Sequence, residues 1–343
     1  MKLLIITQKV DKNDPILGFF HSWLVEFASK VEMLHVVCLE KGEYDLPSNV
    51  FVHSLGKEDG RSKIKYTWKF FKYIYSLRRE YENVFVHMNQ EYVLLAGLWW
   101  KINGKRVFLW RNHKKGNLLT RVAVLFSQKV FCTSPDAFVA RFKKTIQMPV
   151  GIDTTIFSLK INQILENTFL VLGRADPVKR VDTIIDAVKI LKEKGVAIKV
   201  HIVGDSSDRN NLYMDYLKNK TLEAGLDEDI LFFPAVPYTE VSVWYRKYNL
   251  FINLTPEGSL DKTIFEAIAS GLVPVVGNSF FEGKLPNDLI VNTGDSKRIA
   301  NALEYALYIA HSVPPEFREK MKQLSEENSL QNLSKKLMYK MSV

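Results

Sequence analysis

Two glutamates flank the expected start of a helix in the segment TPEGSLDKTIFEAIASGLVPVV, residues 255–276. The spacing of its apolar residues predicts that the helix begins near Asp261 or Lys262. Glu266 then falls in the second turn, off the apolar stripe and without an evident ion-pair partner, whereas Glu257 stays on the loop. A carboxylate at Glu266 can accept two hydrogen bonds from a vicinal diol such as a ribose. The alternative is an ordinary exposed helix glutamate.

Two cations follow the first expected strand of the second half of the chain, in VLGRADPVKRVDTIIDAVKILKEKG. Arg174 lies on the loop after this strand, and Lys179 lies near the start of the next amphipathic helix. Both would project from the carboxyl end of the strand, where two fixed cations suit a diphosphate. The alternative is a pair of solvated surface cations.

The loop after the first strand of the chain, TQKVDKNDPILGFF, ends at Gly18 and Phe19 before another helix. A glycine there lets the backbone approach a ligand, and the amides that follow are free to donate. The sequence contains no G-x-G-x-x-G, so the dinucleotide fingerprint is missing and a plain helix entry is the alternative. His113, in RVFLWRNHKKGN, comes just past another expected strand, although a lone histidine in a basic loop is commonly a surface residue.

Short β-branched runs alternate with helical periods along almost the whole chain, which is the pattern of parallel βαβ units. At 343 residues the chain is long for one domain and comfortable for two. The predicted class is therefore α/β, with Rossmann-like doubly wound domains over 1–150 and 151–312. Two further helices are expected over 313–343, packing back toward the N-terminal domain. Strands are expected at 2–7, 32–39, 49–53, 83–88, 106–111, 129–134, 168–173, 198–204, 230–234, 249–254 and 273–277.

Doubly wound domains that face each other hold a ligand between the carboxyl ends of their strands. Helix N-termini there direct free amides and a positive dipole at an anion. This arrangement predicts a site beside Arg174 and Lys179, with amides from Ser259, Leu260 and Asp261. It does not identify the ligand.

Taken together, these motifs resemble the glycosyltransferases of family 4, which have the GT-B fold, and the resemblance covers nearly the whole chain. MPVGIDTTIF is similar to the family's Asn-Gly-Ile-Asp...Phe segment, with Val150 in place of the usual asparagine. VLGRADPVKRVDTIIDAV resembles its Gly-Arg...Lys segment, which implies diphosphate binding by Arg174 and Lys179. FEAIASGLVPVV resembles its Glu-Ala-Met-Ala-x-Gly-x-Pro-Val signature, which implies ribose binding by Glu266. His113 resembles, by position, a family histidine that contacts the donor sugar.

The chain departs from the family pattern at the first glutamate. In the family seven residues separate the two glutamates, so the partner of Glu266 would stand at the position of Gly258. Glu257 is one position early. Either slack in the loop lets Glu257 reach the hydroxyls of the donor sugar, or backbone amides and Lys262 take over that role. We favour the second alternative.

Composition and charge narrow the class of partner. The formal net charge of +9 indicates an anionic partner, but the basic residues are spread and no nucleic-acid-binding module appears. Cys38 and Cys132 form no metal or disulfide pattern and predict two core residues in a reducing cytoplasm. The acids of LDEDI, residues 226–230, precede a strand away from the predicted site, so no metal is expected. The N-terminal apolar run is too short for a secretory signal, and no run is long enough to span a membrane.

The segment RSKIKYTWKFFKYIYSLRRE, residues 61–80, predicts a helix with an apolar stripe and a basic stripe side by side. A basic amphipathic surface with aromatic edges fits docking on an anionic membrane. The alternative is a sheet-covering helix with a solvated basic face. The apolar stripe consists of Ile64, Trp68, Phe71 and Tyr75, and the basic stripe of Lys65, Lys69, Lys72 and Arg79.

The residues and the resemblance together imply a retaining glycosyltransferase. It would move a hexose-type sugar from a UDP- or GDP-linked donor to a glycan or lipid-linked acceptor, without a metal cofactor. Gly18, Phe19, Val236 and segment 257–262 are expected to contact the donor together with Glu266. The expected location is the cytoplasm, including the inner face of the membrane. Alternatives are an epimerase or phosphorylase of the same fold, or an inactive sugar-nucleotide-binding protein.

Overall fold

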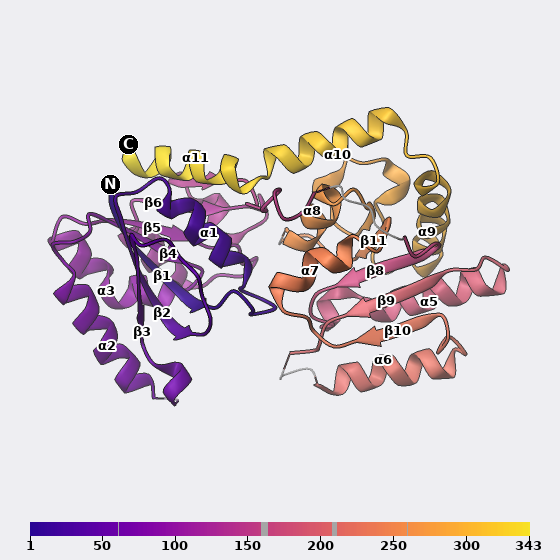
Figure 1. Cartoon of the computed structure of the whole chain (residues 1–343), viewed down its shortest axis with the longest axis horizontal. Helices are drawn as coiled ribbons and strands as arrows, with labels where there is room; N and C mark the ends of the chain where they lie inside the picture. Colours follow the sequence, from indigo (N-terminus) through magenta and orange to yellow (C-terminus); the bar gives the residue numbers. More distant parts are fainter. Residues whose placement is uncertain (61, 159–163, 208–210, 259) are drawn as a thin grey trace. The chain divides into compact units, whose positions relative to one another are not determined.

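The computed structural model describes residues 1–343 except 61, 159–163, 208–210 and 259 (Figure 1). The chain divides into two compact units. The first unit contains Met1–Gly151 together with Leu330–Val343, and the second contains Ile152–Ser329. Each unit is built on one parallel sheet.

In the described part of the first unit, the sheet has seven strands in the order β3-β2-β1-β4-β5-β6-β7. Its central strands are almost continuously apolar, as expected for a parallel sheet covered on both faces. In β1, Ile5 lies opposite Val36 of β2 and Phe85 of β4. The strands are β1 (Lys2–Val10), β2 (Met33–Lys41), β3 (Val50–Ser54), β4 (Asn83–His87), β5 (Arg106–Trp110), β6 (Lys129–Cys132) and β7 (Thr145–Gln147).

Helices cover both faces of this sheet and enclose two separate apolar cores. Neighbouring residues of β4 contribute to different cores, Val84 to one and Phe85 to the other, because side chains alternate along a strand. One core lies under α1 (Phe19–Ala28) and α11 (Leu330–Ser342), and the other under α2 (Lys63–Ser76), α3 (Gln90–Ile102) and α4 (Leu118–Phe126).

The described part of the second unit has a five-stranded parallel sheet in the order β10-β9-β8-β11-β12 (Figure 1). Its central strand β8 is buried throughout. The strands are β8 (Thr168–Leu172), β9 (Lys199–Val203), β10 (Ile230–Phe233), β11 (Leu250–Asn253) and β12 (Val273–Val276). The helices are α5 (Val181–Glu193), α6 (Asn211–Glu223), α7 (Tyr238–Tyr245), α8 (Lys262–Ala269), α9 (Ser296–Ala310) and α10 (Pro315–Glu327).

Both sheets are doubly wound, as the sequence predicts. The chain moves outward from β1 through β2 to β3 and then returns to the other side of β1 with β4, and β8 to β11 repeat this path. Sheets of this kind bind ligands at the carboxyl ends of the strands beside such a reversal. Ligand sites are therefore expected at the ends of β1 and β4 in the first unit and of β8 and β11 in the second.

All the strands expected from the sequence are present, with differences at their ends. β1 continues through Gln8 and Lys9 to Val10 because it stays paired with β2 as far as Lys41. The sequence had assigned these residues to a loop. Cys38 and Cys132 are buried, which confirms them as core residues, and burial raises the pKa of the Cys38 thiol to about 12.

The last two helices of the chain belong to different units. The sequence predicted that both pack back toward the N-terminal domain, but α10 packs on α8 in the second unit. Its buried side chains include Phe317, Met321 and Leu324. Only α11 is part of the first unit, where Leu333 and Leu337 enter the core under α1. The division falls at the turn between the two helices because each has its own apolar face to bury.

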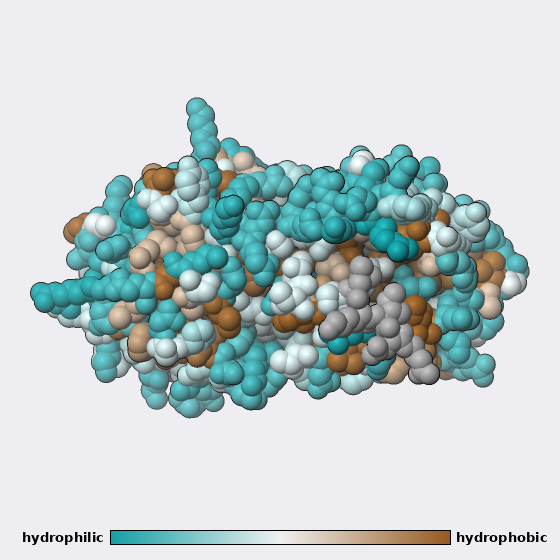
Figure 2. All heavy atoms as spheres, turned by 45° about the horizontal axis from the view of Figure 1, so that its top comes forward, coloured by the Kyte–Doolittle hydropathy of each residue, from teal (hydrophilic) through white to brown (hydrophobic). Residues whose placement is uncertain are grey.

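The helix α2 covers the sheet with a different face from the expected one. Its buried residues are Phe70 and Ile74, whereas Ile64 and Trp68 are 84% and 63% exposed. The apolar stripe read from the sequence therefore faces solvent. None of the helices in the described ranges is both long and apolar enough to cross a membrane. The face of the molecule in Figure 2 is largely hydrophilic, with its apolar residues in separate groups.

Candidate functional site

The carboxyl edge of the second sheet is crowded where β8 and β9 end. Gly173 and Gly204 follow these strands with φ of +126° and +142°, a backbone that favours glycine. A Cβ atom on Gly204 would lie 2.1 Å from the carbonyl oxygen of Gly173. The loops after β8 and β9 therefore approach each other at backbone contact.

Arg174 and Asp176 lie on the loop after β8. The guanidinium of Arg174 is about half exposed, and its Nη1 lies 3.6 Å from the Asp176 carboxylate. Asp176 is itself buried, and its Oδ1 accepts hydrogen bonds from the amide and hydroxyl of Ser207, at 3.0 and 2.9 Å. Asp176 thus joins the loops after β8 and β9, while the Arg174 side chain keeps access to solvent.

Lys179 ends the short helix Pro177–Lys179, immediately before α5. Its ammonium group pairs with the carboxylate of Asp261, and both side chains are more than four-fifths buried. The structure therefore brings the predicted cation of one loop against the predicted anion-binding loop of another. The alternative of a solvated surface lysine does not apply to Lys179.

Asp261 connects the start of α8 with the end of β11. As the N-cap it accepts a hydrogen bond from the Thr263 amide at 3.3 Å, which confirms the predicted helix start. Its second oxygen accepts from Asn253 Nδ2 at 2.8 Å and from Thr255 Oγ1 at 3.3 Å. Asn253 and Thr255 were not predicted from the sequence. The signal that points to them is a run of polar residues directly after a buried strand.

Burial tunes the protonation of Lys179. Desolvation and the neighbouring Arg174 guanidinium lower the pKa of the Lys179 ammonium to about 8, and Asp176 opposes the shift. The contact with Asp261 also favours the charged form. Lys179 therefore remains a cation at neutral pH, close to the N-terminus of α8, whose dipole favours anions. An anion at this edge meets two cationic side chains and a helix N-terminus.

Glu266 is buried, with 2% of its surface exposed. Tyr245 donates a hydrogen bond to one carboxylate oxygen at 3.2 Å, and Tyr238 donates to the other at 3.4 Å. The ring of Phe157 packs edge-on against both tyrosine rings, with centroid distances of 5.6 and 6.1 Å. Glu266 is therefore a held, buried carboxylate, and the alternative of an exposed helix glutamate is excluded.

Lys262 lies one helical turn before Glu266 and acts on its charge. Burial raises the pKa of the Glu266 carboxyl and lowers that of the Lys262 ammonium, and the charge of Glu266 opposes the shift at Lys262. Residues four apart lie on the same side of a helix, so the charge of Lys262 lowers the pKa of Glu266 against the effect of burial. Lys262, which is also predicted to contact the donor, interacts electrostatically with Glu266.

The remaining predicted residues of the second unit belong to the loop before α8 and to the loop before α7. Gly258 has φ of +104° and is buried, so its position requires glycine, whereas Glu257 is exposed. Leu260 is buried, and Ser259 lies outside the described residues. Val236 is half-buried on the loop between β10 and α7.

Gly18, Phe19 and His113 belong to the first unit. Gly18 has right-handed helical dihedral angles, and its amide donates to the Asp14 carbonyl at 2.9 Å, so neither feature requires glycine. Phe19 packs edge-on against the ring of His87. His113 is exposed on the loop after β5, where its Nδ1 accepts a hydrogen bond from the Lys115 amide at 3.0 Å.

The reversal point of the first sheet contains polar residues that were not predicted. Thr7 Oγ1 within β1 and His87 Nδ1 at the end of β4 lie 3.2 Å apart, and both residues are buried. Asn89 donates to the side chain of Gln8 beside them. The His87 ring stacks on Phe20 with centroids 4.1 Å apart. The available signal was polar residues at the carboxyl ends of two apolar strands.

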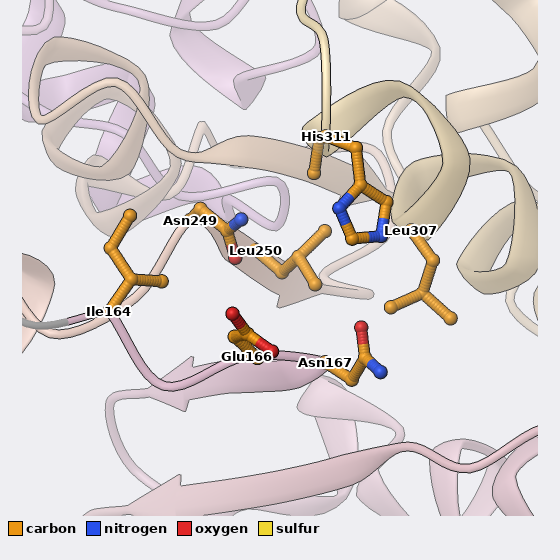
Figure 3. Close-up of a pocket in the computed structure, with 8 residues that line it drawn as sticks. Ile164, Glu166, Asn167, Asn249, Leu250, Leu307 and His311 are labelled. Atoms are coloured by element: carbon orange, nitrogen blue, oxygen red, sulfur yellow. The ribbon is translucent and has the colours of Figure 1, made fainter.

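A pocket of about 450 Å³ lies at the other edge of the second sheet. Figure 3 shows Glu166, Asn167 and His311 around it, with Asn249 and Leu250. Asn167 and Asn249 precede β8 and β11, so this pocket is at the amino edge, away from Arg174 and Lys179. The amino ends of parallel strands meet helix C-termini, whose dipole disfavours anions. This pocket is therefore distinct from the cluster at the carboxyl edge.

Comparison with protein families identifies the class. Residues 157–328 match the family model of the glycosyl transferases group 1, which is half of the chain. The chain belongs to this family and is a glycosyltransferase of the GT-B fold. The matched segment begins at Phe157 and includes Lys179, Asp261 and Glu266. No curated protein matches the chain.

Solved structures share the fold over the whole chain. HepE from Anabaena, in complex with UDP and glucose, has a TM-score of 0.79 and 15% identity, covering 100% of this chain and 99% of that one. Sucrose-phosphate synthase from Thermosynechococcus elongatus has a TM-score of 0.79 and 12% identity, covering 99% and 98%. WaaG, a glycosyltransferase involved in lipopolysaccharide biosynthesis, has a TM-score of 0.65 and 14% identity, covering 99% of each chain. These likenesses describe the fold.

Proposed function

We propose that the protein is a retaining hexosyltransferase that uses a UDP- or GDP-linked sugar and a glycan or lipid-linked acceptor. The observation that carries this proposal is the cluster of Arg174, Lys179 and Asp261 at the reversal point of the second sheet, with buried Glu266 on the same helix as Asp261. HepE, which shares the fold, was crystallised with UDP-glucose. The GT-B fold and family membership are compatible with the same donor class.

In this proposal the donor diphosphate binds Arg174 and Lys179 at the N-terminus of α8. Negative charge grows on the leaving nucleoside diphosphate as the sugar departs, so cations and a helix dipole fixed there stabilise the transition state more than the ground state. Asp261 holds Lys179 while the donor is absent. The diphosphate then replaces or shares Asp261 as the partner of Lys179.

The other parts of the donor have separate ligands in this proposal. The two oxygens of Glu266 accept hydrogen bonds from the ribose hydroxyls, and Tyr238 and Tyr245 fix the carboxylate for that purpose. The backbone near Val236 meets the base, and His113 contacts the sugar. No metal is assigned a role because the two cations supply the charge that a divalent ion would otherwise contribute.

Titration with UDP and with GDP tests the diphosphate assignment. Lys179→Ala is expected to weaken binding of the preferred nucleotide by on the order of tenfold or more, because a charge-assisted contact is lost. Lys192→Ala is the matched control, since Lys192 also pairs with an aspartate of the second unit, at 2.7 Å from Asp229. Unchanged affinity in both Lys179→Ala and Arg174→Ala would contradict the assignment.

The proposal includes docking of the first unit on the cytoplasmic face of an anionic membrane. Lys72 lies over the exposed ring of Trp68 on α2, 5.3 Å from its centroid, so basic and aromatic groups share one surface. Phe70 contacts Tyr92 and Trp100 of α3, and α3 packs on α4, which makes the three helices one layer. The exposed apolar side chains of this layer also include Leu95, Leu98, Ile102, Leu118, Leu119 and Leu125.

Co-sedimentation with vesicles tests this docking surface. The wild type is expected to bind phosphatidylcholine vesicles that contain phosphatidylglycerol, and to be released by high salt, because the attraction is partly electrostatic. Trp68→Ser is expected to weaken binding by several-fold through the loss of buried apolar area. Tyr308→Ser, at a 78% exposed aromatic residue of the second unit, is the control. Equal binding of both variants would contradict the surface.

A further inference from the structure

Three adjacent strands of the first sheet place polar side chains at one stretch of its carboxyl edge. Gln90 is the first residue of α3 after β4, Arg111 directly follows β5, and Thr133 directly follows β6. The strand pairing extends to this edge, where the Met88 amide donates to the Trp110 carbonyl at 2.8 Å and the Arg111 amide to the Phe131 carbonyl at 2.9 Å. We call Gln90, Arg111 and Thr133 the β4–β6 edge.

One buried side-chain atom of each residue of the β4–β6 edge lacks a partner, although Arg111 Nη2 donates to the Lys115 carbonyl at 3.4 Å. Gln90 Oε1, Arg111 Nε and Thr133 Oγ1 form no hydrogen bond with any described residue. Gln90 and Thr133 are 6% and 3% exposed. Nearly all buried polar groups in folded proteins are paired, because an unpaired one loses its hydration without compensation. Three such atoms at the ends of three neighbouring strands indicate groups held ready for a partner from outside the chain.

Backbone strain occurs at the same place. Met88, between β4 and α3, has φ of +67°, an uncommon conformation for a residue with a side chain. Strain of this kind costs free energy and is concentrated at ligand sites, where the surrounding structure maintains it. Here it turns the chain sharply, so that α3 begins at Gln90 directly above the sheet edge.

The charge at the β4–β6 edge is positive. Arg111 is half-buried and forms no ion pair within the described ranges, although the more exposed Glu91 acts on its charge. His113, Lys114 and Lys115 follow on the same loop, all exposed. The N-terminus of the 13-residue helix α3 has no side-chain cap hydrogen bond, and the Nδ2 of the preceding Asn89 donates to the side chain of Gln8. Its dipole adds to the attraction for an anion.

We propose that the β4–β6 edge binds an acceptor sugar that carries an anionic group, either phosphate or carboxylate. The anion pairs with Arg111 at the N-terminus of α3, and hydroxyl groups of the sugar ring pair with Gln90 Oε1 and Thr133 Oγ1. Guanidinium groups suit both anions because their donors match two oxygens at once. This inference rests on the proposed function and adds the chemical class of the acceptor.

Calorimetric titration with glucose 6-phosphate, glucuronate and glucose tests the proposal, each in the presence and absence of UDP. At least one anionic sugar is expected to bind on the order of tenfold more tightly than glucose. The comparison between glucose 6-phosphate and glucuronate decides between phosphate and carboxylate. Arg111→Gln is expected to remove the preference, whereas Arg78→Gln, at a surface arginine beyond α2, leaves it unchanged. Equal affinity for all three sugars, or a preference that survives Arg111→Gln, would overturn the proposal.

Thr133→Val separates ligand binding from a structural role. The substitution keeps the shape of the side chain and removes an unpaired hydroxyl, so thermal stability is expected to stay the same or rise while affinity for the anionic sugar falls several-fold. Loss of stability with unchanged affinity would contradict the assignment. Titration of UDP and of GDP on the same samples tests the donor site independently. A wild type that binds the anionic sugar but neither nucleotide would retain this site and refute the proposed donor.

Discussion

The two sheets have the same winding, but the polar side chains at their carboxyl edges are paired in different ways. In the second unit charged groups are paired within the chain: Lys179 with Asp261, and Glu266 with two tyrosines and Lys262. In the first unit the corresponding edge combines aromatic packing around His87 with buried side-chain oxygens of Gln90 and Thr133 that accept or donate no hydrogen bond among the described residues.

This difference is consistent with different kinds of ligand. A diphosphate carries fixed negative charge. When no diphosphate is bound, an internal carboxylate holds the cation in place and compensates its charge. The proposed acceptor offers ring hydroxyl groups as well as one anionic group, and the hydroxyl groups need single unpaired donors and acceptors beside the Arg111 cation. The second edge is therefore organised before the ligand arrives, and the first edge leaves hydrogen bonds to be completed by it.

The largest expected effect concerns the backbone that holds the second edge together. Gly204→Ala is expected to lower the free energy of unfolding by about 3 kcal/mol, because the new Cβ would overlap the Gly173 carbonyl oxygen in a backbone that favours glycine. Gly225→Ala, with φ of +65° and open space around it, should cost only about 1 kcal/mol. Urea unfolding of both variants measures the difference. Equal losses of unfolding free energy would show that the loops after β8 and β9 can move apart without further cost.

The next effect concerns the charge of Lys179. Because the pKa of this ammonium is lowered to about 8, UDP affinity should fall roughly tenfold as the pH rises through 8. Lys179→Arg stays charged and should lack this fall. Between about pH 8 and the ordinary lysine pKa, the unfolded chain binds more protons at this group, so its contribution to stability rises with pH. If UDP affinity falls equally with pH in the wild type and in Lys179→Arg, the titrating group is a residue other than Lys179.

The smallest effect concerns the residues that hold Glu266. Tyr245→Phe removes a hydrogen bond that lowers the pKa of the Glu266 carboxyl, so this pKa should rise further, and UDP affinity at neutral pH should fall by a few-fold. Tyr248→Phe removes a buried hydroxyl that contacts His201 at 2.8 Å on the same unit and serves as the control. If the two variants bind UDP equally well, Tyr245 supports the fold rather than the ribose.

Much of the architecture followed from the sequence because its determinants are local. Apolar runs of strand length, helical periods and turn residues predicted the described strands except the short edge strand β7, and polar residues after β8 marked the site edge. The helix start at Asp261 followed from a short polar side chain before an apolar period. The split of the last two helices did not follow, because both have an amphipathic period and the period does not state which core it joins.

What the sequence by itself determined is the doubly wound pattern in two halves and the types of residue at the strand ends. Only the tertiary structure decided that Lys179 faces Asp261, that Glu266 is buried between two tyrosines, and that the apolar stripe of α2 points outward. These facts depend on contacts between residues 82 and 21 positions apart in the chain, or on which of two helix faces meets the sheet. Burial and pairing are properties of such contacts, so they appear only when the strands and helices are assembled.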